Sequence, residues 1–314
     1  MTKTEFASRW SRYASGKVGL GCWALGGKHW GGQSDKAARA VLEEAWEAGY
    51  RHFDTASSYG FSERLLGRFL QTVSGGCLVA SKVYPGSCAG RIRETLSRSL
   101  ERLQLARIDL YYLHWPGGGA IERDVEQLAQ SVEEGLVGAI GISNYTAEQV
   151  RAACSVASVA VYQGPYNLIW RSAEDSILPV CQELGIPFVG YGGLAEGLLS
   201  RTEVPPAFPH GDHRSRSSFF AAEHRESVEA FLTDFGNEST LAGTPPAQTA
   251  LKWALQRPGV SAVLAGARRV GQAEQNKAAE QMVLSPPAHD RITALSDAVS
   301  AMWQGRLHYF GEHD

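Results

Sequence analysis

Short apolar runs alternate along the chain with longer stretches in which apolar residues recur every three or four positions. The short runs are apolar at odd and even positions alike, which predicts strands that are covered on both faces. Eight strands are expected, at Val18–Trp23, Tyr50–Phe53, Leu78–Val83, Ile108–Leu113, Gly138–Ile142, Ala160–Gln163, Pro187–Tyr191 and Val260–Leu264.

The longer stretches predict amphipathic helices. In Asp35–Ala48, for example, Ala38, Val41 and Leu42 fall on one helical face, and Gly49 follows as a C-terminal stop. Further helices are expected at Cys88–Leu103, Ile121–Glu134, Ala147–Ala157, Asp175–Leu184, Glu223–Phe235, Ala247–Gln256, Val270–Gln281 and Asp290–Met302.

This alternation predicts an α/β protein built as a (β/α)8 TIM barrel, a fold of about 250 residues. A doubly wound sheet is the alternative, and it would carry G-x-G-x-x-G after its first strand. The sequence GLGCW at residues 19–23 does not lead into that motif. We therefore expect a single barrel domain over residues 1–314, with long βα loops and accessory helices.

One connection, from Leu199 to Pro246, is much longer than the others. It contains several prolines and the polar run HGDHRSRSS, and long connections in compact domains are usually functional lids or disordered segments. Because it follows the seventh strand, we expect it on the active-site face of the barrel. The stretch from Trp303 to Phe310 is expected to form a short aromatic end.

Composition narrows the classes of function. Thirty basic and 33 acidic residues give a net charge of -3, which offers no general attraction to nucleic acid or to an anionic membrane. The five cysteines are scattered and never form a C-x-x-C pair, so we expect no zinc site and no disulfide framework. The N-terminus lacks the apolar core of a signal peptide. A cytoplasmic protein without metal, nucleic-acid or membrane partners is expected.

Polar side chains stand where the second, third and fourth predicted strands end. Asp54 closes the second strand, and Tyr59 follows on its loop. Lys82 closes the third strand and His114 the fourth. Taken singly, Asp54 and Lys82 could form a structural ion pair, and the histidine and tyrosine could be packed rings. Because active sites of barrels lie at the C-terminal ends of the strands, the four residues together favour a catalytic site.

These residue types are suited to proton donation. An unperturbed phenol titrates near pH 10 and is a weak acid at neutral pH. The Lys82 ammonium would lower the pKa of Tyr59, and Asp54 would keep the lysine charged and oriented. Tyr59 could then protonate the alkoxide that forms when hydride reaches a carbonyl, while His114 polarises the carbonyl oxygen. No nucleophile–base pair favours covalent hydrolysis.

Four motifs in this order resemble the aldo-keto reductase family: GYRHFDTASSYGFSERLLGRFL, ASKV, DLYYLHWP and GLVGAIGISNY. The resemblance implies catalytic roles for Asp54, Tyr59, Lys82 and His114. It also implies a nicotinamide cofactor, with the pair Ser143-Asn144 and Gln163 on the carboxamide and Tyr191 stacked on the ring. The cofactor-binding residues that it implies are Trp23, Ser143, Asn144, Gln163, Tyr191, Gly192, Leu194, Gly197, Gly266, Arg268, Arg269, Gln272 and Asn276.

The segment GARRVGQAEQN, residues 266–276, resembles the family's site for the adenosine end of the cofactor. It lies at the start of a predicted helix, where backbone N–H groups favour an anion. Arg268 and Arg269 would hold the 2′-phosphate of NADPH, and two solvated arginines are the alternative. Because a 2′-phosphate carries roughly two negative charges, the arginine pair favours NADPH over NADH.

One departure from the family pattern follows the seventh strand. Many relatives have Ser-Pro-Leu after the stacking aromatic residue, whereas this chain has Gly192-Gly193-Leu194. The serine usually touches the pyrophosphate, so we expect that contact from the backbone of Gly192, from Leu194 or Gly197, or from the long connection.

Tryptophans on the predicted βα loops could form the substrate pocket, with Trp30, Trp115 and Trp170 as its walls. Lys28, His29 and Arg171 are polar candidates on the same loops. The sequence therefore predicts an NADPH-dependent oxidoreductase that reduces an aldehyde or ketone to an alcohol, or the reverse. A barrel isomerase or lyase that retains NADP, and a non-catalytic NADPH-binding subunit, are the alternatives. The expected partner is a small molecule, bound by a monomer or homo-oligomer.

Overall fold

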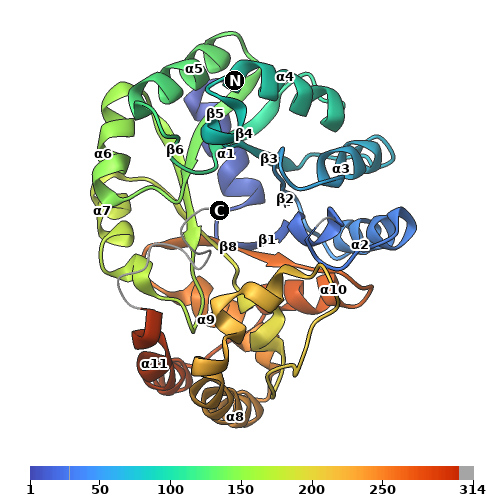
Figure 1. The fold of residues 1–314 in the computed structure, drawn as a ribbon, viewed down its shortest axis with the longest axis vertical. Coiled ribbons are helices and arrows are strands. Elements are labelled where there is room, and N and C mark those ends of the chain that lie inside the picture. Colours follow the sequence, from blue (N-terminus) through green and yellow to red (C-terminus); the bar gives the residue numbers. More distant parts are fainter. Residues whose placement is uncertain (28, 304–314) are drawn as a thin grey trace.

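The computed structural model describes residues 1–27 and 29–303. Its strands form a closed barrel in which each strand pairs in parallel with the next and β8 pairs with β1 (Figure 1). The strands are β1 Lys17–Gly21, β2 His52–Asp54, β3 Leu78–Val83, β4 Ile108–Leu113, β5 Val137–Ser143, β6 Val159–Pro165, β7 Phe188–Tyr191 and β8 Val260–Gly266. The predicted (β/α)8 barrel is confirmed.

Helices surround the barrel and bury one face against it (Figure 1). In α2, for instance, the buried residues Ala38, Val41, Leu42 and Ala45 repeat at helical spacing. The helices are α1 Lys3–Tyr13, α2 Asp35–Glu47, α3 Ser62–Leu70, α4 Ile92–Leu103, α5 Ile121–Glu133, α6 Ala147–Val156, α7 Ile177–Leu184, α8 Arg225–Leu241, α9 Pro246–Gln256, α10 Gln272–Lys277 and α11 Pro286–Ser300.

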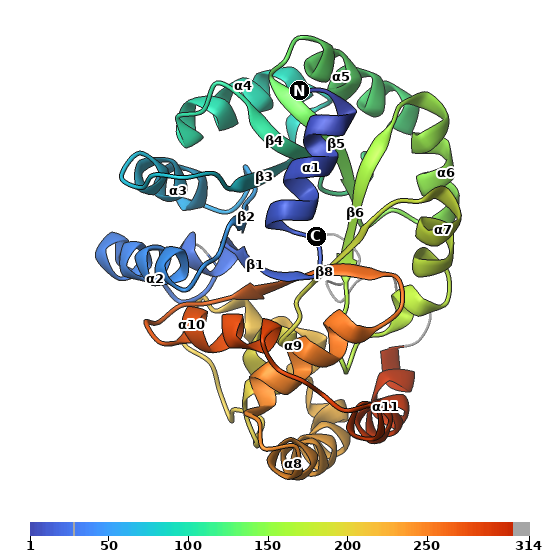
Figure 2. The same ribbon diagram turned by 180° about the vertical axis from the view of Figure 1, so that it is seen from behind.

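Helix α1 closes the end of the barrel at which the strands begin (Figure 2). A capping box starts it: Thr2 Oγ1 accepts from the N–H of Glu5 at 3.1 Å, and Glu5 Oε2 accepts from the N–H of Thr2 at 2.7 Å. Phe6 and Trp10 then pack into the interior of the barrel against residues such as Leu78. Neither α1 nor α3 was among the predicted helices. With α1 at this end, the opposite end remains for the site.

The long connection after β7 lies on the site face, as expected. It holds several short 3-10 turns and then α8, which continues past the predicted end at Phe235 to Leu241 and buries Ser239 in this added part. Helix α8 packs beside α11. Helix α11 begins at Pro286, a residue type favoured in the first helical turn, rather than at Asp290. Of the expected aromatic end, residues 304–310 lie outside the described residues.

Among the described residues, no helix combines the length and the apolar composition that a membrane crossing requires.

Candidate active site

The ends of three neighbouring strands bring the predicted catalytic side chains together. Asp54 is the last residue of β2, and Lys82 lies in β3. Tyr59 comes from the loop after β2, and His114 directly follows β4. The Lys82 ammonium donates to Asp54 Oδ1 and, at 3.0 Å, to the backbone oxygen of Thr55. The Tyr59 hydroxyl oxygen lies 3.4 Å from His114 Nε2, so the two side chains converge on one point.

Burial dominates the ionisation of this cluster. It raises the pKa of the Tyr59 phenol well above its ordinary value, and the Asp54 carboxylate adds to the rise. Burial also lowers the pKa of Lys82, against the opposing effect of Asp54. The expectation of a lowered pKa for Tyr59 is therefore wrong: desolvation of the phenolate raises it, although Nζ of Lys82 lies 5.2 Å from the centre of the phenol ring.

The residues expected at the nicotinamide form one hydrogen-bonded network. Asn144 follows β5 with a φ of 63°, a left-handed conformation that asparagine tolerates better than most residues. Its Nδ2 donates to Ser143 Oγ and to the backbone oxygen of His114, both at 3.0 Å. The Tyr191 hydroxyl donates to Asn144 Oδ1 at 2.8 Å. This network joins the ends of β5 and β7 to His114.

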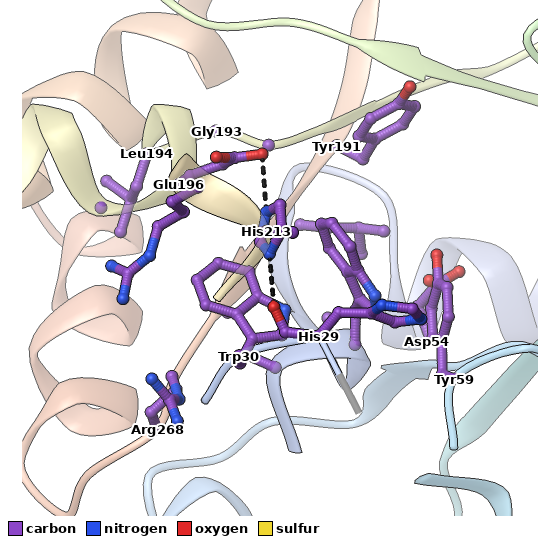
Figure 3. A pocket seen from close by; sticks show the side chains of 18 of the residues that line it. His29, Trp30, Asp54, Tyr59, Tyr191, Gly193, Leu194, Glu196, His213 and Arg268 are labelled. Atoms are coloured by element: carbon purple, nitrogen blue, oxygen red, sulfur yellow. Dashed lines mark hydrogen bonds and ion pairs between the residues drawn. The ribbon is translucent and has the colours of Figure 1, made fainter. Parts of the chain in front are cut away.

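A cavity of about 1100 Å³ opens over these residues and continues to the arginines of the β8 exit (Figure 3). Figure 3 shows Asp54 and Tyr59 at one end of the view, Arg268 at the other, and His213 between them. Lys82 and Ser143 are fully buried and do not line the cavity. The predicted residues that line it are Trp23, Trp30, Asp54, Tyr59, His114, Trp115, Asn144, Gln163, Tyr191, Gly192, Leu194, Gly197, Gly266, Arg268, Arg269, Gln272 and Asn276.

Steric constraints explain why glycine occupies both positions after β7, Gly192 and Gly193. Gly192 has a φ of 67°, in the left-handed region, and its carbonyl oxygen accepts from Asn167 Nδ2 at 3.0 Å. A Cβ at Gly193 would lie 2.9 Å from Leu251 Cδ2 and 3.3 Å from the backbone oxygen of Leu264. The pair therefore lets the chain turn tightly against β8.

The backbone N–H groups at the start of α10 donate to side chains of the protein itself. The N–H groups of Arg268 and Arg269 donate to Gln272 Oε1 at 2.9 and 3.0 Å, and the N–H of Gly271 donates to the Glu44 carboxylate. These groups were expected to favour an anion, but they already have acceptors. The arginine side chains are left as the groups that could hold a phosphate.

Arg268 is held in place on the wall of the cavity. Its Nη2 donates to the backbone oxygen of Gly32 at 2.9 Å, and its Cζ lies 5.7 Å from the centre of the Trp30 ring. Its Nε is buried and has no hydrogen-bond partner in the described part of the chain. A buried donor of this kind is costly unless an acceptor reaches it, and a phosphate oxygen would meet that need. Asn276 donates to the backbone oxygen of Gly266 at 3.2 Å.

Residues 201–224, which we call the strap, cross one side of the cavity. Asp212 of the strap forms a β-bridge with Trp30, and its buried carboxylate binds Arg214 with an Oδ2–Nη2 distance of 2.7 Å. The Arg214 Cζ lies 5.0 Å from the centre of the Trp30 ring. Trp30 is only 8% exposed as a result, so it is a wall between the strap and Arg268.

A second attachment of the strap is the pair of His213 and Glu196, two residues that the sequence did not single out. Glu196 follows β7 in a left-handed conformation, with a φ of 57°, and its side chain is 2% exposed. His213 Nε2 lies 3.0 Å from Glu196 Oε1, and the imidazole ring packs 4.4 Å from the indole of Trp23 (Figure 3). Both residues line the cavity, beside the expected path of the pyrophosphate.

The expected substrate walls are only partly present. Trp115 lines the cavity beside His114. Trp170 does not line it: the side chain is fully buried in the core, with ring centroids 6.0 Å from Phe219 and 6.3 Å from Trp303. Arg171 does not line it either, because it is bound to carboxylates of Glu174 and Asp297. His29 lines the cavity, whereas Lys28 lies outside the described residues.

Within residues 1–27 and 29–303, no three His, Cys, Asp or Glu side chains gather into a group that could hold a metal ion.

Comparison with known proteins agrees with this architecture. A profile of the Aldo/keto reductase family matches residues 17–297. The aldo-keto reductase YhdN of Bacillus subtilis is 32% identical over 277 residues, covering 82% of this chain and 83% of that protein. The structure of the glycerol dehydrogenase AKR11B4 from Gluconobacter oxydans matches with a TM-score of 0.79 and 29% identity, covering 95% of this chain and 93% of that one.

An aldo/keto reductase from Klebsiella pneumoniae, solved in complex with NADP and acetate, matches with a TM-score of 0.73 and 27% identity, covering 92% of this chain and 94% of that one. A closed parallel barrel with its polar cluster at the strand ends defines the class of (β/α)8 enzymes. The chain belongs to the aldo-keto reductase family, whose members are oxidoreductases.

Proposed function

We propose that the chain is an NADPH-dependent reductase that converts an aldehyde or ketone to an alcohol, or catalyses the reverse. The observation that carries the proposal is the convergence of the Tyr59 hydroxyl and His114 Nε2, 3.4 Å apart, where the cavity meets the buried Lys82–Asp54 pair. The complex of the Klebsiella pneumoniae relative with NADP supports the choice of cofactor.

The residues that line the cavity fit nicotinamide adenine dinucleotide phosphate. Tyr191 and Asn144 stand at the catalytic end of the cavity, where the nicotinamide would lie. Arg268, with its unmatched Nε, and the exposed Arg269 stand at the other end, where they would hold the 2′-phosphate. Bound NADPH would supply the hydride for the reduction.

The chain's own residues would handle the proton. Because burial raises the pKa of Tyr59, its phenol stays protonated at neutral pH, which is the form that a proton donor needs. An alkoxide is a stronger base than a phenolate, so transfer from Tyr59 Oη to the new alkoxide oxygen is favourable even for this weak acid. His114 Nε2 would hold the same oxygen in place and polarise the carbonyl before it reacts.

The test is Tyr59→Phe, which removes one oxygen and keeps the ring. We expect NADPH oxidation with simple aldehydes to fall by about three orders of magnitude, since general acid catalysis contributes about 10²–10⁴-fold. NADPH binding, followed by fluorescence, should change less than about twofold. Tyr145→Phe is the matched control: it removes a buried hydroxyl on a residue that does not line the cavity, and it should keep full activity.

Retained turnover in Tyr59→Phe would sink the proposed acid role. Parent enzyme that converts a substrate with no net loss of NADPH absorbance would instead favour an isomerase or lyase with internal hydride return. Binding of NADPH without turnover of any aldehyde, ketone or alcohol would favour a non-catalytic subunit.

A further inference from the structure

The amide of Gln163 contacts the carboxylate of Asp54 directly. Gln163 lies in β6 and is 2% exposed, and Asp54 ends β2 and is 3% exposed. Gln163 Nε2 donates to Asp54 Oδ2 at 2.9 Å, while Asp54 Oδ1 accepts from Lys82. We infer that Gln163 is a positioning residue for Asp54, in addition to any contact with the cofactor. This inference rests on the proposed function, in which Asp54 belongs to the proton-donating cluster.

The hydrogen bond crosses the interior of the barrel. In the strand order β1 to β8, strands β2 and β6 stand opposite each other, so no backbone pairing ties Asp54 to Gln163. The side-chain contact therefore fixes the carboxylate against the far wall, while Lys82 of the adjacent β3 fixes it on the near side. With one donor for each oxygen, the carboxylate has little freedom to rotate.

Chemistry also determines how the amide is turned. An ionised carboxylate only accepts, so the amide must present its NH2 group to Asp54 and point Oε1 away from it. Gln163 therefore holds the Asp54 carboxylate in the orientation in which Oδ1 accepts from Lys82. Asp54 in turn holds the Lys82 ammonium in place, with Nζ 5.2 Å from the centre of the Tyr59 ring.

The variant Gln163→Met tests this role, because it keeps the length of the side chain and removes its donor. We expect kcat to fall by about tenfold or more, because the carboxylate that orients Lys82 can rotate once one of its oxygens has lost its donor. The dissociation constant for NADPH should change less than about threefold.

Ser143→Ala is the comparison variant. Ser143 belongs to the network expected at the carboxamide, and its hydroxyl accepts from Asn144 rather than contacting Asp54. It should weaken NADPH binding more than it lowers kcat at saturating NADPH. If Gln163→Met instead behaves like Ser143→Ala, with weaker NADPH binding and little loss of kcat, Gln163 serves the cofactor alone and the inference is overturned.

A second measurement uses the cofactor-free protein. In Gln163→Met the buried Asp54 carboxylate keeps Lys82 but loses its second side-chain donor, so the variant should have a lower free energy of unfolding than the parent at neutral pH. An unfolding free energy equal to that of the parent would contradict the inference. If Tyr59→Phe is inactive but neither Gln163→Met signature appears, only the role of Gln163 fails; if Tyr59→Phe stays active, the proposed function fails.

The double variant Asp54→Asn with Gln163→Glu reverses donor and acceptor. It should recover part of the unfolding free energy that each single variant loses, since the amide introduced on β2 can then donate to the carboxylate introduced on β6. Additive losses would show that the two side chains do not support each other.

Discussion

Nε2 of His213 lies 3.0 Å from Oε1 of Glu196, and this pair fastens the strap to the segment that follows β7. On the other side of the ring, His213 Nδ1 lies 2.7 Å from the backbone oxygen of His29. The backbone oxygen of His29 can only accept, so Nδ1 is the ring nitrogen that donates to it. The strap is thus held by an imidazole that lies between a buried carboxylate and a backbone carbonyl.

Replacing His213 by Phe should destabilise the protein. The ring would still pack on Trp23, but the buried Glu196 carboxylate would lose the imidazole beside it, and leaving a buried polar group without a partner costs about 1–3 kcal/mol. We expect the free energy of unfolding to fall by an amount of that order, with faster amide hydrogen exchange in residues 201–224. Urea denaturation and hydrogen exchange measure the two effects.

The double variant His213→Phe with Glu196→Leu is the control for this pair. Replacing both partners by apolar side chains removes the unpaired charge, so most of the lost stability should return. A His213→Phe variant as stable as the parent would show that the pair makes no net contribution to the free energy of unfolding.

His114 offers a test of carbonyl polarisation. Its Nε2 lies 3.4 Å from the Tyr59 hydroxyl, so both groups address one substrate oxygen. His114→Ala removes one donor and should lower kcat by about 10²–10³-fold. The hydrogen bond from Asn144 goes to the backbone of His114 and survives the substitution, so NADPH affinity should be unchanged. A large loss of NADPH affinity with an unchanged kcat would assign the side chain to binding instead.

The two arginines at the β8 exit should contribute unequally. Arg268 is fixed by Gly32 and Trp30 and presents a buried, unmatched Nε, whereas Arg269 is exposed. Arg268→Ala should therefore raise KM for NADPH by about tenfold or more, and Arg269→Ala by less.

NADH is the internal control for these variants, because it lacks the 2′-phosphate. The KM for NADH should change little in either variant. High salt should reduce the effect of Arg269→Ala on the KM for NADPH more than the effect of Arg268→Ala, because salt screens the exposed arginine more strongly. Equal losses for NADPH and NADH would remove the arginines from phosphate recognition.

The sequence was sufficient to predict the barrel and the clustering of the four candidate catalytic residues, because both depend on local patterns. Strands buried on both faces are visible as apolar runs, and the barrel topology brings Asp54, Lys82 and His114 to neighbouring strand ends. The pKa of Tyr59 was predicted in the wrong direction, because it depends on burial, which no spacing of charges reveals.

Contacts between distant irregular segments were not predictable. His213 and Glu196 lie in loops without periodicity, and their pairing exists only once the strap has crossed the cavity. Trp170 follows a strand end, as a substrate wall would, yet it packs against Phe219 and Trp303 from far along the chain. The polar run HGDHRSRSS, placed on the site face, was the available signal for His213.

At the opposite end of the barrel, His52 should make stability depend on pH. The ring is 1% exposed, packs edge-on to Trp10, and neither nitrogen has a hydrogen-bond partner in the described part of the chain. Burial lowers the pKa of His52 to about 4, while nearby Asp54 opposes the shift and Lys82 adds to it. An unfolded histidine titrates near 6.5, so between these two values the unfolded chain binds the proton that the folded chain excludes.

The stabilisation from a neutral His52 is therefore complete above pH 6.5 and is lost as the pH falls toward 4, by up to about 3 kcal/mol. His52→Leu should remove this slope, so the variant should lose less stability than the parent between these two pH values. His210→Gln, at an exposed position of the strap, is the matched control and should follow the parent. Urea denaturation across this range measures the free energy of unfolding at each pH. If this free energy falls in parallel for the parent and His52→Leu, other groups account for the loss of stability in acid.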